Sequence, residues 1–218
     1  MAGLNLSTFK YPIGFIKLIE FLFTVIAIAA VNSWGGEVNY SCPPNSTTTT
    51  KSFSTFSLSD VDFKCDDKSS HVWTSENNSG GSAGFFYFVN VTGLIYTLVA
   101  MFVYVILWQL YQNEKRIALG DLAITALLFV LFFLCSSIWW AGANNIGRAT
   151  SDETLGELFN KSSATLGGAK YISRSVNNGK LAISVLSDWV CVLCFALNCW
   201  FIWKEIVPRS QENPTSIA

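Results

Sequence analysis

The chain has 218 residues, of which 51% are hydrophobic and only 13% are charged. This composition and a mean hydropathy of +0.39 are typical of a membrane protein. The formal net charge of -1 excludes the concentrated basic surface on which nucleic-acid binding depends, so we expect no nucleic-acid partner. The six cysteines are too few for a disulfide-rich miniprotein, and their positions must indicate their roles.

Four apolar stretches are long enough to cross a hydrocarbon core of about 30 Å as helices. We expect these transmembrane helices at residues 14–34, 84–110, 120–143 and 181–203. The remaining segments are 1–13, 35–83, 111–119, 144–180 and 204–218. Four spans place both termini and the short middle connection on one side of the membrane and the two long loops on the other. The expected fold is therefore an all-α membrane protein, a bundle of four transmembrane helices.

The first stretch contains two charged residues, Lys17 and Glu20, and only eleven residues separate Glu20 from Asn32. Eleven helical residues reach about 17 Å, which is too short to span the membrane. We therefore expect the two charges to be anchors at the interface, where the lysine stem can extend to the surface and the side chains, at i and i+3, can pair. A cleaved signal peptide, with its cleavage site at residues 31–33, is the alternative, although Glu20 beside the apolar region is atypical of one.

The two long loops favour a lumen on their side and the cytosol on the side of the termini. They carry four candidate N-glycosylation sites, Asn39, Asn45, Asn77 and Asn160. The numbers of lysine and arginine residues on the two sides do not decide the orientation. Alternation in residues 51–59 is typical of a strand, so we expect short β-strands in the first luminal loop.

Cysteine positions suggest three different roles. Cys42 and Cys65 are the only cysteines outside the spans, and in an oxidising lumen they can form a disulfide. Closing that loop stabilises it by about 3 kcal/mol on the chain-entropy model. Cys191 and Cys194 have C-x-x-C spacing but lie within a span, where packed thiols are the better interpretation. Cys199, near the cytosolic end of the same helix, is a palmitoylation candidate.

Asp188 is the one acidic residue well inside a span, where it costs about 2.5 to 3.5 kcal/mol and must face protein or water. It marks either a polar path, with Asn90 and Asn198 as intramembrane partners, or a hydrogen-bonded helix contact. We favour the contact, because one acidic residue makes a thin transport pathway. His71 is the only histidine, so we expect neither a metal site nor a catalytic dyad.

Tryptophans mark the expected span limits. The interfacial aromatic belt expected at helix ends comprises Trp34, Trp139 and Trp140 on the loop side and Trp108, Trp200 and Trp203 on the side of the termini. Trp189 lies inside the fourth span and does not fit this pattern. Residues 10–18 and 107–115 match loose sterol-contact patterns, which fit many helix ends.

Four stretches in chain order resemble the synaptophysin (physin) family of vesicle membrane proteins, which share the four-helix MARVEL architecture. The matching residues are Pro12, Gly14, Phe15 and Lys17 in the first span, Cys42 in "VNYSCPP", Asp121, Ser136, Ser137 and Trp139 in the third span, and Asn198, Trp200, Phe201, Lys204 and Glu205 at the end of the fourth. The second loop has no cysteine, so the second disulfide of vertebrate members is absent and we expect this loop to be less constrained. The short tail resembles that of a pantophysin-like or invertebrate member.

The resemblance implies a non-enzymatic, multi-pass protein of synaptic or other cytoplasmic transport vesicles with both termini in the cytosol. Such proteins organise the vesicle membrane and assist sorting and retrieval of the SNARE synaptobrevin (VAMP) in exocytosis and endocytosis. The resemblance also implies homo-oligomers, association with cholesterol and no other cofactor, and it favours a retained first helix over a signal peptide. Two other functions remain open: a channel or transporter that uses Asp188, and a four-span junction or adhesion protein.

Overall fold

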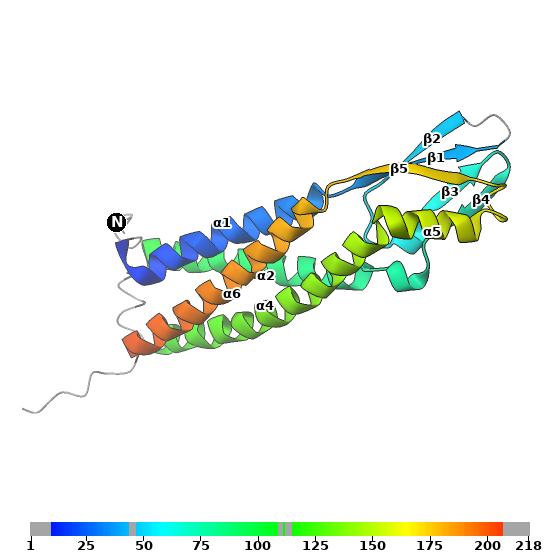
Figure 1. Cartoon of the computed structure of the whole chain (residues 1–218). Coiled ribbons are helices and arrows are strands. Elements are labelled where there is room, and N and C mark those ends of the chain that lie inside the picture. The colour runs from blue at the N-terminus through cyan, green and yellow to red at the C-terminus, as the bar shows by residue number, and fades with distance from the viewer. Residues whose placement is uncertain (1–9, 44–46, 109–110, 112–114, 207–218) are drawn as a thin grey trace, which may run out of the picture.

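The computed structural model describes residues 10–43, 47–108, 111 and 115–206. The molecule is elongated, with a bundle of long helices at one end and a smaller module that contains the described strands at the other (Figure 1). Of the residues that the structure describes, 69% are helical. A four-helix membrane bundle with short strands in a loop region confirms the fold class predicted from the sequence.

Four helices form the bundle. They are α1 (Pro12–Asn32), α2 (Gly80–Ile106), α4 (Lys115–Ala149) and α6 (Gly179–Ile206). All four are long and apolar enough to cross a membrane. Both α2 and α6 pack against α1 and against α4, so the helices form a closed ring. The 35 residues of α4 extend beyond the expected limits of 120–143 at both ends, and at about 52 Å this helix is longer than a hydrocarbon layer is thick.

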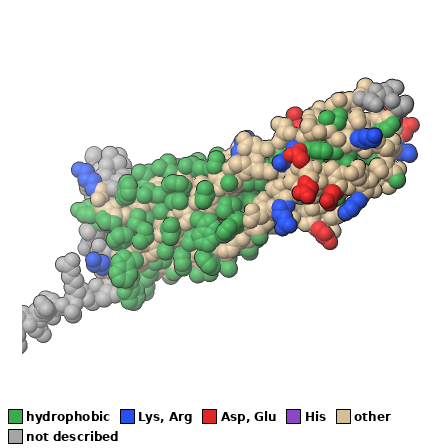
Figure 2. Space-filling model, in the orientation of Figure 1, with side chains coloured by type: hydrophobic (Ala, Val, Ile, Leu, Met, Phe, Trp, Pro, Cys, Tyr) green, Lys and Arg blue, Asp and Glu red, His purple; other side chains and the backbone are tan. Residues whose placement is uncertain are grey.

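Apolar side chains cover the outside of the bundle, whereas the charged side chains visible in the same view gather mainly over the strand module (Figure 2). Phe88, Ile95 and Phe102 on α2 and Leu193 on α6 are between 58% and 63% exposed. Most of the polar side chains within the spans face inward instead. This distribution is the one a lipid environment selects, because lipid cannot hydrogen-bond an exposed polar group.

Two small sheets and a helix form the strand module, which comprises residues 35–79 and 150–178. The antiparallel sheet has the order β2-β1-β5. Its strands are β1 (Gly36–Cys42), β2 (Thr47–Phe53) and β5 (Lys170–Val176); the second sheet is the hairpin of β3 (Asp62–Cys65) and β4 (Lys68–His71), and the helix is α5 (Asp152–Ser162). Of the strand expected at 51–59, only residues 51–53 belong to β2, and the short 3-10 helix Leu58–Asp60 follows.

The second loop is held by pairing across the chain, which corrects the expectation that it is less constrained. β5 pairs with β1 from Gly36↔Val176 to Ser41↔Lys170, so the two loops share one sheet. On α5, the fully buried Phe159 packs against the rings of Tyr40 and Phe63 from the first loop. Backbone pairing and aromatic packing thus restrain the loop where a second disulfide is absent.

The end of α4 is tied to the module by side chains that bind its last backbone oxygens. The Trp73 indole Nε1 donates to the Ala149 carbonyl at 2.9 Å, and Arg174 donates to the carbonyl of Thr150. These donors satisfy carbonyls that have no partner within the helix itself. Ser151 then starts α5 as its N-cap, because its hydroxyl accepts from the Thr154 amide.

Two tryptophans assigned to the aromatic belt are instead buried where the bundle meets the module. Trp139 is fully buried and donates to the Ser184 hydroxyl at 2.8 Å, and Trp34 stacks on Phe56. Both rings lie in protein because the module covers this end of the bundle. Exposed tryptophans remain at Trp140, Trp200 and Trp203.

Gly93 lies at a close approach of α2 to α4. A Cβ atom at this position would lie 2.6 Å from the ring of the fully buried Phe132. We expect Gly93→Leu to destabilise the protein by about 1–3 kcal/mol, the usual cost of overpacking. Thermal unfolding in detergent measures the change. Gly84→Leu on the same helix is the control, because a Cβ there meets nothing within 4 Å; equal losses in the two variants would contradict the close-packing argument.

Candidate functional site

Lys17 and Glu20 lie inside the bundle and form a buried ion pair. The Lys17 Nζ donates to the Glu20 Oε2 at 2.9 Å, and neither side chain is exposed. Asn198 on α6 donates to the other carboxylate oxygen at 3.3 Å. The Lys17 ammonium also lies 4.3 Å from the centre of the Tyr96 ring on α2. The expected pairing of Lys17 with Glu20 is confirmed, whereas the expectation that the lysine stem extends to the surface is wrong, because both side chains are buried among neighbouring helices.

Asp121 on α4 binds hydroxyl groups of α2 and of the segment between α2 and α4. It accepts hydrogen bonds from Tyr96, from Tyr104 at 2.5 Å and from Tyr111 at 2.9 Å. Tyr96 joins the two groups, since its ring lies against Lys17 and its hydroxyl binds Asp121 and Thr125. We call this set the terminal polar cluster: Lys17, Glu20, Asn198, Tyr96, Asp121, Tyr104 and Tyr111.

The tyrosines of the terminal polar cluster are functional candidates that the sequence reasoning missed. Their numbers, 96, 104 and 111, differ by eight and by seven residues. Such spacing returns a side chain to nearly the same face of a helix, and it is the signal that could have identified them.

Asp188 is enclosed by protein in the middle of the bundle. The Cys135 thiol of α4 donates to its Oδ2 at 3.7 Å, and the side chain is fully buried. The Asn90 amide lies beside the carboxyl group, whereas Asn198, the other expected partner, binds Glu20 instead. Within the described residues, the Asp188 Oδ1 and the Asn90 Oδ1 have no hydrogen-bond partner. Asp188 therefore forms a contact between helices in which two side-chain oxygens have no hydrogen-bond partner among the described residues.

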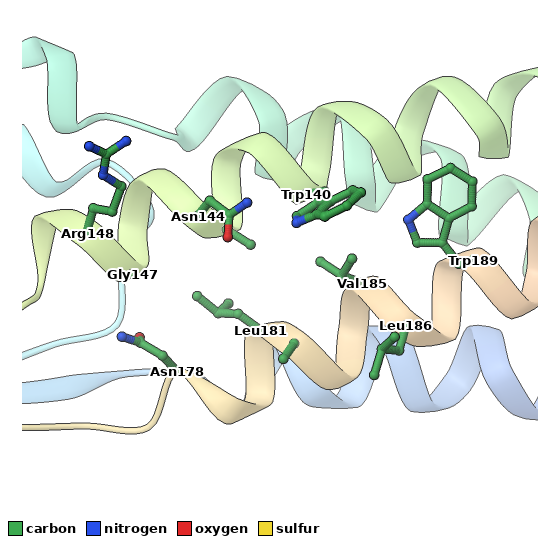
Figure 3. Close-up of a pocket in the computed structure, with 11 residues that line it drawn as sticks. Trp140, Asn144, Gly147, Arg148, Asn178, Leu181, Val185, Leu186 and Trp189 are labelled. Atoms are coloured by element: carbon green, nitrogen blue, oxygen red, sulfur yellow. The ribbon is translucent and has the colours of Figure 1, made fainter.

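A groove separates α4 from α6 at the end of the bundle near the module (Figure 3). Its volume is about 700 Å³. The residues that line it are Trp140, Ala143, Asn144, Gly147 and Arg148 of α4, Asn178, which precedes α6, and Leu181, Ala182, Val185, Leu186 and Trp189 of α6. Trp189, the tryptophan that did not fit an interfacial belt, thus lies at the apolar end of a groove.

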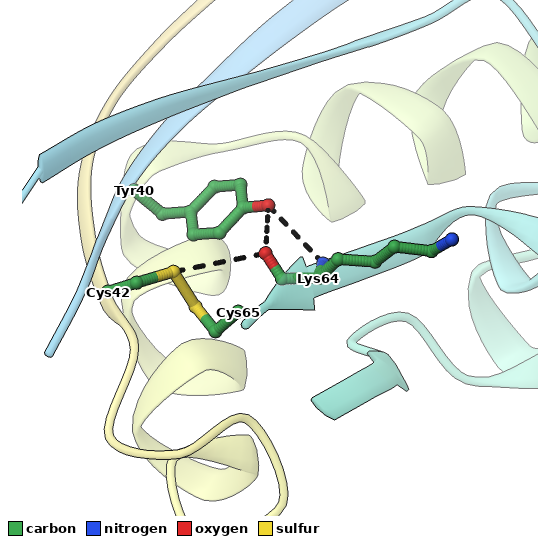
Figure 4. Close-up of a disulfide and its surroundings, with 4 residues drawn as sticks. All are labelled: Tyr40, Cys42, Lys64 and Cys65. Carbon is green, nitrogen blue, oxygen red and sulfur yellow. Dashed lines mark hydrogen bonds between the residues drawn. A yellow bond between two sulfur atoms is a disulfide. The ribbon is translucent and has the colours of Figure 1, made fainter. Parts of the chain in front are cut away.

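A disulfide between Cys42 and Cys65 closes the first loop (Figure 4). Their Cα atoms are 5.5 Å apart, and the bridge joins the end of β1 to the end of β3. Beside it the Tyr40 hydroxyl donates to the Lys64 carbonyl at 2.9 Å and accepts from the Lys64 amide at 3.3 Å. The bridge and the tyrosine therefore fix β1 to the β3–β4 hairpin.

The candidate modification sites differ in accessibility. Asn160 is exposed on α5, whereas the Asn39 amide in β1 donates to Ser173 at 3.1 Å and the Asn77 side chain accepts from Thr74. Asn45 lies outside the described residues. Cys199 is a half-buried free thiol on α6. Glycosylation and palmitoylation at these positions stay predictions.

Within the described ranges, no three His, Cys, Asp or Glu side chains lie together as a metal site requires. His71 is exposed, and its Nε2 lies 3.1 Å from the Asp62 Oδ1. The chemistry that the described residues do offer consists of ion pairing and hydrogen bonding inside the bundle and apolar contact on its outside.

The buried ion pair predicts that the effects of substituting Lys17 and Glu20 on the free energy of unfolding are strongly coupled. We expect Lys17→Met to destabilise the protein by about 3–5 kcal/mol, because it leaves a carboxylate buried without its cation. The double variant Lys17→Met/Glu20→Leu should recover most of that loss. Thermal unfolding of the single and double variants measures the coupling, and additive losses would contradict it. His71→Gln, at an exposed pair, is the control and should change stability by less than about 1 kcal/mol.

The exposed Asp152 carboxylate predicts a pH dependence of the module. Hydrogen bonds from Tyr171 and from Arg174 hold its pKa below the usual value. A lowered pKa stabilises the folded state above the ordinary value of about 3.9, and this contribution is lost as the pH falls through the lower, folded-state value. We therefore expect the difference in thermal stability between the wild type and Asp152→Asn to be constant from pH 7 to pH 5 and to shrink below about pH 4. A change between pH 5 and pH 7 would contradict this assignment.

Comparison with known protein families gives one match that covers most of the chain. The MARVEL membrane-associating domain matches residues 9–201. This range contains α1, α2 and α4, most of α6 and the whole strand module, so the match includes both loops as well as the bundle. The chain is therefore a multi-pass membrane protein that belongs to the MARVEL family.

Proposed function

We propose that this protein is a synaptophysin-type member of the MARVEL family, a non-enzymatic organiser of synaptic or other transport vesicle membranes. In this role it assists the sorting and retrieval of the SNARE synaptobrevin (VAMP) during exocytosis and endocytosis. It forms homo-oligomers in membranes that contain cholesterol, with its termini in the cytosol and the strand module in the lumen.

One observation carries this proposal: several of the residues on which the resemblance to synaptophysins rests form contacts that hold the bundle together. Lys17 and Asn198 meet at Glu20, and Asp121 binds the tyrosine hydroxyls. Trp139 is fully buried and hydrogen-bonded to Ser184. These matches lie inside the bundle and support a shared architecture, whereas other matching residues, such as Phe15 and Trp200, are exposed on its outside.

The apolar outer faces of the spans supply the partner surface. A SNARE with a single transmembrane helix meets the protein within the membrane, where association depends on packing and not on a hydrophobic effect. Exposed side chains on α2 and α6, among them Ile95, Phe102 and Leu193, are available for such packing. Since the polar residues of the terminal polar cluster bind one another, these outer faces remain free for neighbours.

The disulfide supports the proposed orientation, because structural disulfides persist in oxidising compartments such as the lumen of the secretory pathway. The exposed Asn160 on the same module is accessible to glycosylation there. The enclosure of Asp188 favours an organising role over transport. Its carboxyl group is buried against protein, and Asp188 does not line the groove between α4 and α6.

Photo-crosslinking from outward-facing positions tests the proposal. A photoreactive amino acid replaces Ile95, Phe102 or Leu193 in the full chain, expressed in neurosecretory cells. We expect crosslinks to synaptobrevin from one or more of these positions, and co-purification of synaptobrevin with the wild-type protein in mild detergent. Ile172 is the matched control, because it is 49% exposed but lies on β5 of the strand module, and it should give no such crosslink.

Absence of synaptobrevin from both the crosslinks and the purified material would overturn the sorting role. A mainly plasma-membrane pool after surface labelling of intact cells would instead indicate adhesion. Conductance in reconstituted membranes that disappears in Asp188→Asn would indicate a channel.

A further inference from the structure

The groove between α4 and α6 is polar at one end and apolar at the other. Arg148, Asn144 and Asn178 lie toward the strand module, whereas Trp140, Val185 and Trp189 lie farther along the bundle (Figure 3). On each helix the lining residues recur every three or four positions, so one continuous face of α4 opposes one continuous face of α6. The groove therefore runs along the two helices and is amphipathic.

The polar end offers a cation, the guanidinium group of Arg148. Arg148 is exposed, and within the described part of the chain it forms no ion pair. Asn178 lies on the other side of the groove (Figure 3) and is held in place, because its Oδ1 accepts from the Trp34 indole at 3.3 Å and its Nδ2 donates to the Thr150 hydroxyl at 3.2 Å. The exposed Asn144 adds amide donors one helical turn from Arg148. An arginine with amide donors nearby is suited to a phosphate group, which accepts several charge-assisted hydrogen bonds.

The length of the groove matches one leaflet of a bilayer. Arg148 and Trp140 are about 12 Å apart along α4, and Gly179, the first residue of α6, is about 15 Å from Trp189 along that helix, at 1.5 Å per residue. Half of a hydrocarbon core measures about 15 Å. A molecule whose headgroup lies at Arg148 would thus have its acyl chain against Val185 and Trp189, within the same leaflet.

We propose that this groove binds one phospholipid, with its phosphate at Arg148 and Asn144 and one acyl chain between α4 and α6. The volume of about 700 Å³ lies within the range of about 300–1,000 Å³ that ligand sites occupy. The small residues Ala143, Gly147 and Ala182 keep the groove open, because larger side chains at these positions would project into it.

The unpaired charge favours a phospholipid over the other apolar occupants of a membrane. A sterol presents a single hydroxyl group and no negative charge to Arg148. A transmembrane helix from a partner would press apolar side chains against the guanidinium group, which costs free energy unless an acid accompanies it. A phosphate ester satisfies the charge and leaves the apolar walls to an acyl chain.

Native mass spectrometry of the full chain released from lipid nanodiscs tests the proposal. The probe is 1-palmitoyl-2-oleoyl phosphatidylcholine; dioleoylglycerol, which lacks the phosphate, and cholesterol are the comparison lipids. We expect one retained phosphatidylcholine per chain in the wild type, and retention lowered about tenfold or more in Arg148→Gln, as for the loss of a charge-assisted hydrogen bond. Ala182→Trp should also abolish retention, because it fills the groove without changing Arg148.

Arg116→Gln is the matched control, since Arg116 is an exposed arginine near the opposite end of α4 and lies outside the groove. We expect it to retain the phospholipid as the wild type does, and all variants should keep the wild-type elution volume and melting temperature. Equal phosphatidylcholine retention in the wild type, Arg148→Gln and Ala182→Trp would overturn the proposal. So would preferential retention of cholesterol or dioleoylglycerol that is insensitive to Arg148→Gln.

Discussion

Charged side chains within an apolar layer need partners inside the protein, and this constraint organises the bundle. Lys17 and Glu20 find theirs in each other, in Asn198 of α6 and in the ring of Tyr96 on α2, which turns one face of α1 toward both neighbours. Asp121 turns α4 toward α2 in the same way. The Lys17–Glu20 pair and Asp121 thus set which helix faces meet, and the apolar faces that remain define the outer surface.

The sequence predicted the helices because hydropathy is a local property, and a run of apolar residues has few alternatives to spanning the membrane. It also predicted the disulfide between Cys42 and Cys65, the only cysteines outside the spans. It did not predict that β5 would complete the sheet of β1, since nothing near residues 170–176 indicates a partner more than a hundred residues earlier. Pairing of this kind depends on which segments the bundle brings together.

The candidate sites were harder to predict than the helices for the same reason. The position of Lys17 near the start of a span suggested that its stem would reach water, but burial depends on the neighbours Tyr96 and Phe195, which the local sequence does not show. Trp189 did not fit the aromatic belt because it lines a groove, and that groove forms only where α6 packs beside α4. Such features arise between elements, and periodicity within one element cannot reveal them.

The sheet that joins the two loops also sets an order of events during biosynthesis. Synthesis proceeds from the N-terminus, so Cys42 and Cys65 are both available before α2 is made. β1 and β2 can pair at the same stage, but β5 is translated only after α4 and α5. The edge of β1 therefore stays open until the third span is in place. Closure of the sheet thus requires that α1, α2 and α4 have all been made, and until then the open edge of β1 can pair with another chain.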